Sequence, residues 1–231
     1  MAVQDDAREQ ELCNLFNLEW DPDHARDGVD AWFETTVDGI THRVPVEVKS
    51  TTTDSVSTAR DVGLSHINRW RSKFWVIGFY ASMGGLPRIG HCLCLTPSEM
   101  RPWIDQIENY VLPDFRISEE AAKHLTLDDL HLVCGEKAEY DLKDAQALYK
   151  RQWQKTQYLE AMDLENGYSP LKMLEILRSR LRYIADRGST LNNPHIPKGF
   201  LSQFSAQWIL RDHAASIREK FTYYVKANQD S

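Results

Sequence analysis

The sequence lacks an apolar run long enough to cross a bilayer, and its first residues, Met-Ala-Val-Gln-Asp-Asp, are polar and acidic rather than hydrophobic. Internal repeats and low-complexity segments are also absent from its 231 residues. A chain of this length can bury one sizeable core, or a core domain with an insertion. Its composition of 42% hydrophobic and 26% charged residues is ordinary for a soluble globular protein. Because neither a membrane span nor a signal peptide is evident, we expect a cytoplasmic protein without membrane association.

Cysteine is scarce. The four cysteines, Cys13, Cys92, Cys94 and Cys134, do not have the spacing of a disulfide framework. His91-Cys92-x-Cys94 could supply half of a zinc site, but the second pair of ligands that a structural zinc site requires is not evident. We therefore interpret Cys92 and Cys94 as neighbours on one face of a β-strand.

The chain also lacks a positive net charge, since its formal charge at pH 7 is −7. This argues against a protein that coats nucleic acid non-specifically, although a basic cleft can coexist with an acidic exterior. Basic residues do cluster in one stretch, at Arg60, His66, Arg69, Arg71 and Lys73. Such a cluster is typical of a solvated helix face and gives mild support to a nucleic-acid-facing surface.

A β-hairpin is the most informative pattern in the sequence. Residues 31–36 and 40–48 are rich in β-branched and aromatic side chains, and Asp38-Gly39 between them is a strong hairpin signal. The second run ends in Glu47-Val48-Lys49. Since side chains alternate along a strand, Glu47 and Lys49 share one face while Val48 points the other way.

A carboxylate and an ammonium that share one strand face favour metal-assisted phosphodiester hydrolysis. A divalent cation offsets the charge of the phosphate and activates water, and hard cations prefer carboxylate oxygens. A lysine beside the metal can orient the water and stabilise developing negative charge. The alternative is a surface ion pair, because charges at alternate positions are common on any solvated sheet face.

The acid that accompanies Glu47 depends on the hairpin turn. A two-residue turn at Asp38-Gly39 places Asp30 opposite Glu47. A three-residue loop that also includes Val37 places Asp27 on the face of Glu47 and Lys49. Sequence spacing leaves both alternatives open.

The remaining pattern predicts an α/β (α+β) fold with a central mixed β-sheet flanked by helices. The run at residues 74–80 is continuously apolar, as expected of a strand buried on both faces. A polar loop rich in serine and threonine follows Lys49. We expect a further strand at 88–95 and helices at 5–15, 62–73, 97–110, 141–162, 171–187 and 201–225.

A second signature, Thr190-Leu-Asn-Asn-Pro-His-Ile-Pro-Lys198, precedes the last expected helix. Its two prolines favour a stiff, extended segment that presents its side chains. Asparagine can bind adenine through two hydrogen bonds and lysine or arginine can bind guanine, so the segment has the chemistry of base recognition. A capped turn is the alternative, because asparagine and proline also favour turns for local reasons.

Asp27 or Asp30 followed by Glu47-x-Lys49 resembles the PD-(D/E)xK nuclease superfamily, with Arg26 in place of the proline. The later order of motifs is more specific. Ser57-Thr58, the strand at 74–80 and Asn192-Asn193-Pro194-x-Ile196-Pro197 resemble the PvuII-like type II restriction endonucleases. The resemblance covers roughly residues 27–95 and 191–199.

This resemblance implies a restriction-endonuclease-like core and a hydrolase that forms a homodimer and cuts a palindromic site in double-stranded DNA with Mg²⁺. A DNA methyltransferase would be its partner in restriction-modification. Asp27, Glu47 and Lys49 correspond to the catalytic residues, and Asp27, Glu47 and the backbone carbonyl of Val48 to the metal ligands, with Asp30 as the alternative acid. The expected DNA contacts are Ser57, Thr58, Arg60, Asp61, Asn192, Asn193 and His195.

The chain departs from this family at three places. Ala59-Arg60-Asp61 replaces a histidine cluster, the hairpin is longer, and residues 105–187 have no counterpart in the smallest members. We expect one domain, residues 1–231, with a helical insertion at 105–187. The rival interpretations are a structure-specific repair or recombination nuclease and a catalytically inactive DNA-binding module on the same scaffold.

Overall fold

The computed structural model describes residues 2–20, 28–58, 62–81, 87–188 and 193–229. The chain forms two compact units, Met1–Asn109 together with Asn192–Ser231, and Tyr110–Leu191. The expected helical insertion, residues 105–187, overlaps the second unit. Among the described helices, none combines the length and the apolar character that crossing a membrane requires.

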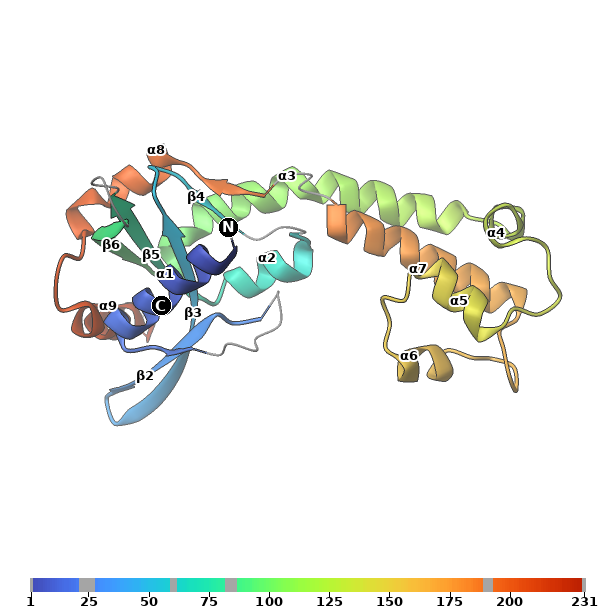
Figure 1. The fold of residues 1–231 in the computed structure, drawn as a ribbon, viewed down its shortest axis with the longest axis horizontal. Coiled ribbons are helices and arrows are strands. Elements are labelled where there is room, and N and C mark those ends of the chain that lie inside the picture. The colour runs from blue at the N-terminus through green and yellow to red at the C-terminus, as the bar shows by residue number, and fades with distance from the viewer. Residues whose placement is uncertain (1, 21–27, 59–61, 82–86, 189–192, 230–231) are drawn as a thin grey trace. The chain divides into compact units, whose positions relative to one another are not determined.

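The first unit is built around a five-stranded sheet with the strand order β1-β2-β3-β5-β6 (Figure 1). Strands β3 and β5 are parallel, and every other neighbouring pair in this sheet is antiparallel. The expected α/β fold with a mixed central sheet flanked by helices is therefore confirmed. The strands are β1 (Glu19–Trp20), β2 (Ala31–Val37), β3 (Ile40–Thr51), β5 (Phe74–Ala81) and β6 (Arg88–Leu95).

Of the two turns that the sequence left open, the β2-β3 hairpin has the two-residue turn. Val37 pairs with Ile40, so only Asp38 and Gly39 form the loop. Their φ angles, 50° and 80°, are both positive, as a type I′ turn requires. Ala31 pairs with Val46 in this register, and its continuation by one residue brings Asp30 opposite Glu47.

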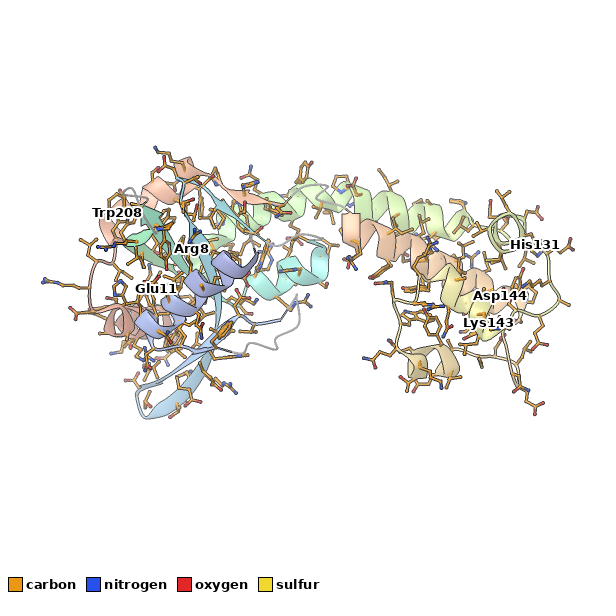
Figure 2. All side chains as sticks on the ribbon, viewed as in Figure 1. Arg8, Glu11, His131, Lys143, Asp144 and Trp208 are labelled. Carbon is orange, nitrogen blue, oxygen red and sulfur yellow. The ribbon has the colours of Figure 1, made fainter. Side chains whose placement is uncertain are left out.

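One face of the sheet packs against helices α1 (Ala2–Phe16) and α9 (His213–Gln229). Phe33, Phe74 and Phe221 lie at the centre of this core, with ring centroids 5.6 to 6.0 Å apart. The Tyr80 hydroxyl joins α1 to β5 by donating to Glu11 at 2.9 Å, and Glu11 is labelled on α1 in Figure 2. Val46 and Val48 of β3 are buried in the same core.

The opposite face carries a tryptophan cluster. Trp70 comes from α2 (Leu64–Trp70), Trp75 from β5 and Trp103 from α3 (Pro97–His124), with ring centroids 5.2 to 5.7 Å apart. Glu47 pairs with Trp75 in the parallel register. Because side chains alternate, Glu47 and Lys49 lie on this face, away from the core of Val46 and Val48.

The second unit is helical and has its own core, centred on the buried rings of Tyr140, Tyr158 and Tyr168. The C-terminal part of α3 packs along α7, where the Ser118 hydroxyl donates to the Leu181 carbonyl at 3.1 Å. Asp144, labelled in Figure 2, completes a capping box at the start of α5. The other helices are α4 (Leu127–Cys134), α5 (Leu142–Leu148), α6 (Lys155–Glu160) and α7 (Pro170–Gly188).

Two expected helices are wrong in their extent. The helix expected at 141–162 is divided into α5 and α6, because Lys150 and Arg151 have φ angles of 54° and 56° that no α-helix contains. The helix expected at 201–225 is replaced by α8 (Lys198–Leu201), a 3₁₀ helix (Ser202–Gln207) and α9. Between these elements Ile209 pairs with Cys92 of β6, so tertiary pairing interrupts the helix.

The type I′ turn generates a stability prediction. A side chain at Gly39 meets no neighbouring atom within 4 Å, so Gly39→Ala adds backbone strain alone. We expect it to lower the free energy of unfolding by about 1 kcal/mol, because a left-handed conformation is unfavourable for a residue with a Cβ atom. Urea denaturation measures the change.

Gly199→Ala is the matched control, because Gly199 has equally open surroundings and no positive φ. It should leave stability unchanged or slightly raised. Equal effects of the two substitutions would contradict the role given to the turn.

Candidate functional site

The β2-β3 hairpin brings Asp30, Glu47 and Lys49 together. Asp30 accepts a hydrogen bond from the backbone N–H of Val48 and another from Lys49 Nζ, both at 2.9 Å. Lys49 Nζ also lies 2.9 Å from Glu47 Oε1. The side chains of Asp30 and Lys49 are 14% exposed and that of Glu47 is 3% exposed. The two carboxylates therefore converge on the Lys49 ammonium at a largely buried point.

The ammonium of Lys49 marks a place where three oxygens converge. It donates to Asp30 Oδ2 and to the Val48 carbonyl at 2.9 Å, and it is paired with Glu47 Oε1 at the same distance. Two of these oxygens belong to carboxylates and one to the backbone. Such a set has the geometry and the charge to surround a cation.

Lys73 is a member of this site that sequence reasoning missed. We interpreted it as part of a solvated basic cluster, but its side chain is only 2% exposed. Its ammonium donates to Glu47 Oε2 and to the Gly28 carbonyl, both at 2.6 Å. The signal was its position immediately before β5 and two residues before Trp75, the residue that pairs with Glu47.

Among the described side chains, the charges of Lys49 and Lys73 oppose those of Asp30 and Glu47 in this centre. Burial alone would raise the pKa of Glu47, but the charges of Lys49 and Lys73 and the hydrogen bonds from both lower it to about 2. Burial alone would likewise lower the pKa of Lys49, but Asp30 and Glu47 raise it above its usual value. Glu9 on α1 contributes further to that increase. Both groups therefore stay charged at neutral pH.

Two other members of the expected basic cluster, His66 and Arg71, are held by contacts within the protein. His66 is buried, and this burial lowers its pKa. Arg71 donates to Asp105 of α3 at 2.6 Å and also binds Glu108. Arg60 lies outside the described residues. The interpretation of this stretch as a solvated helix face is therefore wrong for His66 and Lys73.

A short two-stranded ribbon joins the two segments that were expected to contact DNA. Strand β4 (Val56–Ser57) pairs with β7 (His195–Ile196), although 138 positions separate Ser57 from His195. The Ser57 hydroxyl lies 3.1 Å from His195 Nδ1. Thr58 holds the Pro194 carbonyl through its backbone N–H at 3.0 Å and its hydroxyl at 2.8 Å.

The exposure of the ribbon residues shows which side chains face solvent and which stabilise the ribbon. Ser57 and His195 are exposed and Asn193 is half-buried, so these side chains can reach a ligand. Thr58 is buried and supports the ribbon through Pro194. The expected site residues Asp27, Arg60, Asp61 and Asn192 lie outside the described residues.

The oxygens around Lys49 are of the kind that hard divalent cations prefer. Among the residues that the structure describes, no group of three or more histidine, cysteine, aspartate and glutamate side chains could hold a metal. Mg²⁺ does not need such a cage, since it is commonly bound by one or two carboxylates together with water and substrate phosphates. Asp30, Glu47 and the Val48 carbonyl supply such a set.

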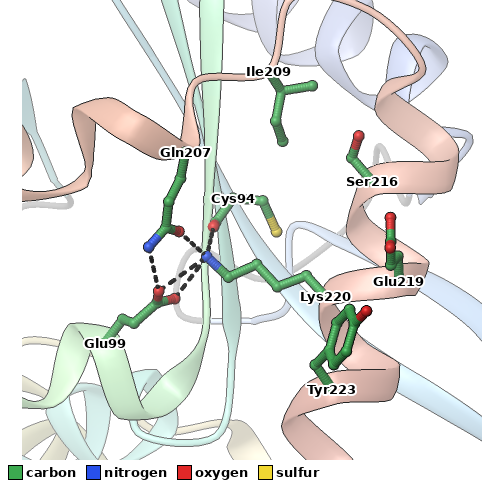
Figure 3. A pocket seen from close by; sticks show the side chains of 8 residues that line it. All are labelled: Cys94, Glu99, Gln207, Ile209, Ser216, Glu219, Lys220 and Tyr223. Carbon is green, nitrogen blue, oxygen red and sulfur yellow. Dashed lines mark hydrogen bonds and ion pairs between the residues drawn. The ribbon is translucent and has the colours of Figure 1, made fainter.

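A separate cavity of about 350 Å³ lies between β6 and α9 (Figure 3). Lys220 reaches across it and donates to the Cys94 carbonyl at 2.6 Å and to Glu99 at 3.0 Å. Gln207 accepts a further hydrogen bond from the same ammonium. Because these polar groups bind one another, we assign the cluster a structural role in joining β6, α3 and α9.

Comparison of the chain with protein-family models, with curated proteins and with solved structures gives no significant match. The assignment of a function therefore depends on the residues and geometry of the chain itself.

The charge balance around Glu47 generates a prediction for stability against pH. Its folded pKa, about 2, lies below its ordinary value of 4.5, so the ionised carboxylate stabilises the fold above pH 4.5. This contribution is lost as the pH falls from 4.5 towards 2. We expect Glu47→Gln to lower stability at neutral pH by about 3 kcal/mol, because it removes the carboxylate that pairs with the buried Lys73. The same substitution should flatten the acid side of the stability profile.

Urea denaturation at a series of pH values measures both effects. Glu120→Gln is the control, because it removes an ion-paired carboxylate that is 63% exposed, and it should change little. If the stability of Glu47→Gln depends on pH in the same way as that of the unaltered chain, the two lysines do not stabilise the ionised Glu47 carboxylate.

Proposed function

We propose that this chain is a type II restriction endonuclease that hydrolyses phosphodiester bonds of double-stranded DNA at a specific site with Mg²⁺. The observation that carries the proposal is the convergence of Asp30, Glu47 and the Val48 carbonyl on the position of the Lys49 ammonium. Acidic oxygens and one lysine at a single point are the groups that metal-assisted phosphodiester hydrolysis needs.

Each group has a distinct task in this proposal. Asp30, Glu47 and the Val48 carbonyl hold Mg²⁺, which supplies charge neutralisation of the phosphate and a more acidic water when bound. Lys49 orients the attacking water and stabilises negative charge that develops at the phosphate. Asp27, the acid that the family resemblance implies, lies outside the described residues, so Asp30 is the aspartate argued from geometry.

The β4-β7 ribbon supports DNA recognition next to this centre. Only residues 52–55 separate the end of β3 from β4, and the Thr51 hydroxyl binds the Ser55 carbonyl at 2.7 Å across this turn. The catalytic strand thus leads directly into the segment that carries Ser57. In this proposal Ser57, Asn193 and His195 contact the DNA, as do the neighbouring residues Arg60, Asp61 and Asn192.

The proposal includes a restriction-endonuclease-like core and a homodimer. A palindromic site has two-fold symmetry, and a two-fold protein presents the same ribbon to both half-sites. A DNA methyltransferase that protects the same site is the expected genetic partner. The helical unit, Tyr110–Leu191, is the part that we assign to dimer formation or to embracing DNA.

Digestion of methyl-free phage DNA with the purified chain tests the proposal. We expect discrete fragments with Mg²⁺ and none with EDTA. Lys49→Ala and Asp30→Asn should each reduce cleavage by at least about 100-fold, since each removes a group that acts at the reacting phosphate. Asp38→Asn is the matched control, because Asp38 lies in the exposed hairpin turn. This variant should cleave DNA at the normal rate.

The pattern of products separates the alternatives. Cleavage restricted to branched or nicked DNA would replace the proposal with a structure-specific nuclease. Binding of DNA without cleavage in any divalent cation would replace it with an inactive DNA-binding module. Equal activity of Asp30→Asn and Asp38→Asn would contradict the placement of the site.

The ribbon generates a separate prediction about recognition. Asn193→Ala should lower the rate of cleavage at the specific site by about 10- to 100-fold, because a bidentate contact to a base contributes that much discrimination. Binding to unrelated DNA should change little, since phosphate contacts dominate it. Asn228→Ala, at an exposed position on α9, is the control. Uniform loss of binding to all sequences would argue against base recognition by Asn193.

A further inference from the structure

The two oxygens of Glu47 have different neighbours. Oε1 is paired with Lys49, whose side chain is 14% exposed, at 2.9 Å. Oε2 is paired with Lys73, whose side chain is 2% exposed, at 2.6 Å. Of the two oxygens, Oε1 therefore has the more exposed partner and Oε2 the more buried one.

The ammonium of Lys73 is held by two acceptors. Besides Glu47 Oε2, its ammonium binds the Gly28 carbonyl at 2.6 Å. Gly28 lies two residues before Asp30, so Lys73 joins the two segments that carry the acids. Lys49 is different, because its ammonium occupies the place proposed for the cation and its side chain is 14% exposed. Lys49 is the lysine that a cation displaces in this inference, whereas Lys73 stays on Oε2.

A carboxylate that has one oxygen already bound by a lysine distinguishes between Ca²⁺ and Mg²⁺. Ca²⁺ takes six to eight oxygen ligands and often binds both oxygens of a carboxylate. Mg²⁺ requires octahedral geometry and is satisfied by single oxygens and water. A glutamate that offers one oxygen therefore suits Mg²⁺ better than Ca²⁺.

We propose that Lys73 is a selectivity residue: by reserving Oε2 of Glu47 it makes Glu47 a monodentate ligand and biases the cation site towards Mg²⁺ and against Ca²⁺. This inference rests on the function proposed above. Lys73, the buried lysine to which we assign this role, belongs neither to the hairpin nor to the Glu47-x-Lys49 motif.

Calorimetric titration of Mg²⁺ and of Ca²⁺ into the metal-free full-length chain tests the inference without measuring cleavage. In Lys73→Met, Oε2 is free, so the Kd for Ca²⁺ should fall by about tenfold more than the Kd for Mg²⁺, a difference of about 1.4 kcal/mol. Lys73→Gln removes the charge but keeps an N–H donor for Oε2. In Lys73→Gln the ratio of the Kd for Ca²⁺ to the Kd for Mg²⁺ should remain near that of the unaltered chain.

Lys220→Met is the matched control. Lys220 also binds one glutamate, Glu99, and one backbone carbonyl, that of Cys94, but it lies outside the proposed site. Its removal should leave the ratio of the two Kd values unchanged. Circular dichroism of each variant verifies that it is folded before titration.

The outcomes separate this inference from the proposed function. Equal gains for both cations in Lys73→Met, or no gain, would overturn the selectivity role and leave the proposed function intact. No binding of either cation by the unaltered chain would overturn both. If Lys73→Met does not fold, a crystal structure of the unaltered chain with Ca²⁺ decides. Glu47 bound through Oε1 alone supports the inference, and bidentate binding refutes it.

Discussion

The site depends on the neutralisation of a buried glutamate by two lysines. Glu47 is 3% exposed, and an isolated charge in such a place would be strongly unfavourable. Lys49 and Lys73 each bind one of its oxygens, and Asp30 balances the second positive charge. In the proposed function, a divalent cation takes the position of the Lys49 ammonium among the three oxygens. The charge balance thus links the stability of the fold to its proposed chemistry.

Backbone geometry brings these four side chains together. The type I′ turn at Asp38-Gly39 fixes the register that sets Asp30 opposite Glu47. The parallel pairing of β3 with β5 brings Lys73, the residue immediately before β5, to the second oxygen of Glu47. Residues 52–55 lead from the end of β3 into β4, where pairing with β7 presents Ser57 and His195. A short turn therefore connects the strand of the acidic centre to the ribbon.

Local patterns predicted the hairpin and the shared face of Glu47 and Lys49, because strand alternation is a short-range property. Spacing left the turn open, since the loop depends on the left-handed conformations of Asp38 and Gly39. Lys73 was missed because its contact with Glu47 comes from pairing between distant strands. The expected helices at 141–162 and 201–225 failed for a similar reason. Helical periodicity does not reveal the left-handed Lys150 or the pairing of Ile209 with Cys92.

The central claim is that Asp30, Glu47 and the Val48 carbonyl form a cation site at the position of the Lys49 ammonium. Anomalous diffraction from crystals of the unaltered chain soaked in Mn²⁺ tests it most directly, because the signal locates the metal without reference to activity. We expect one peak bound to these three oxygens, with the Lys49 side chain displaced and Lys73 still on Glu47. An empty site with Lys49 in place, or a peak bound only elsewhere on the chain, would contradict the account.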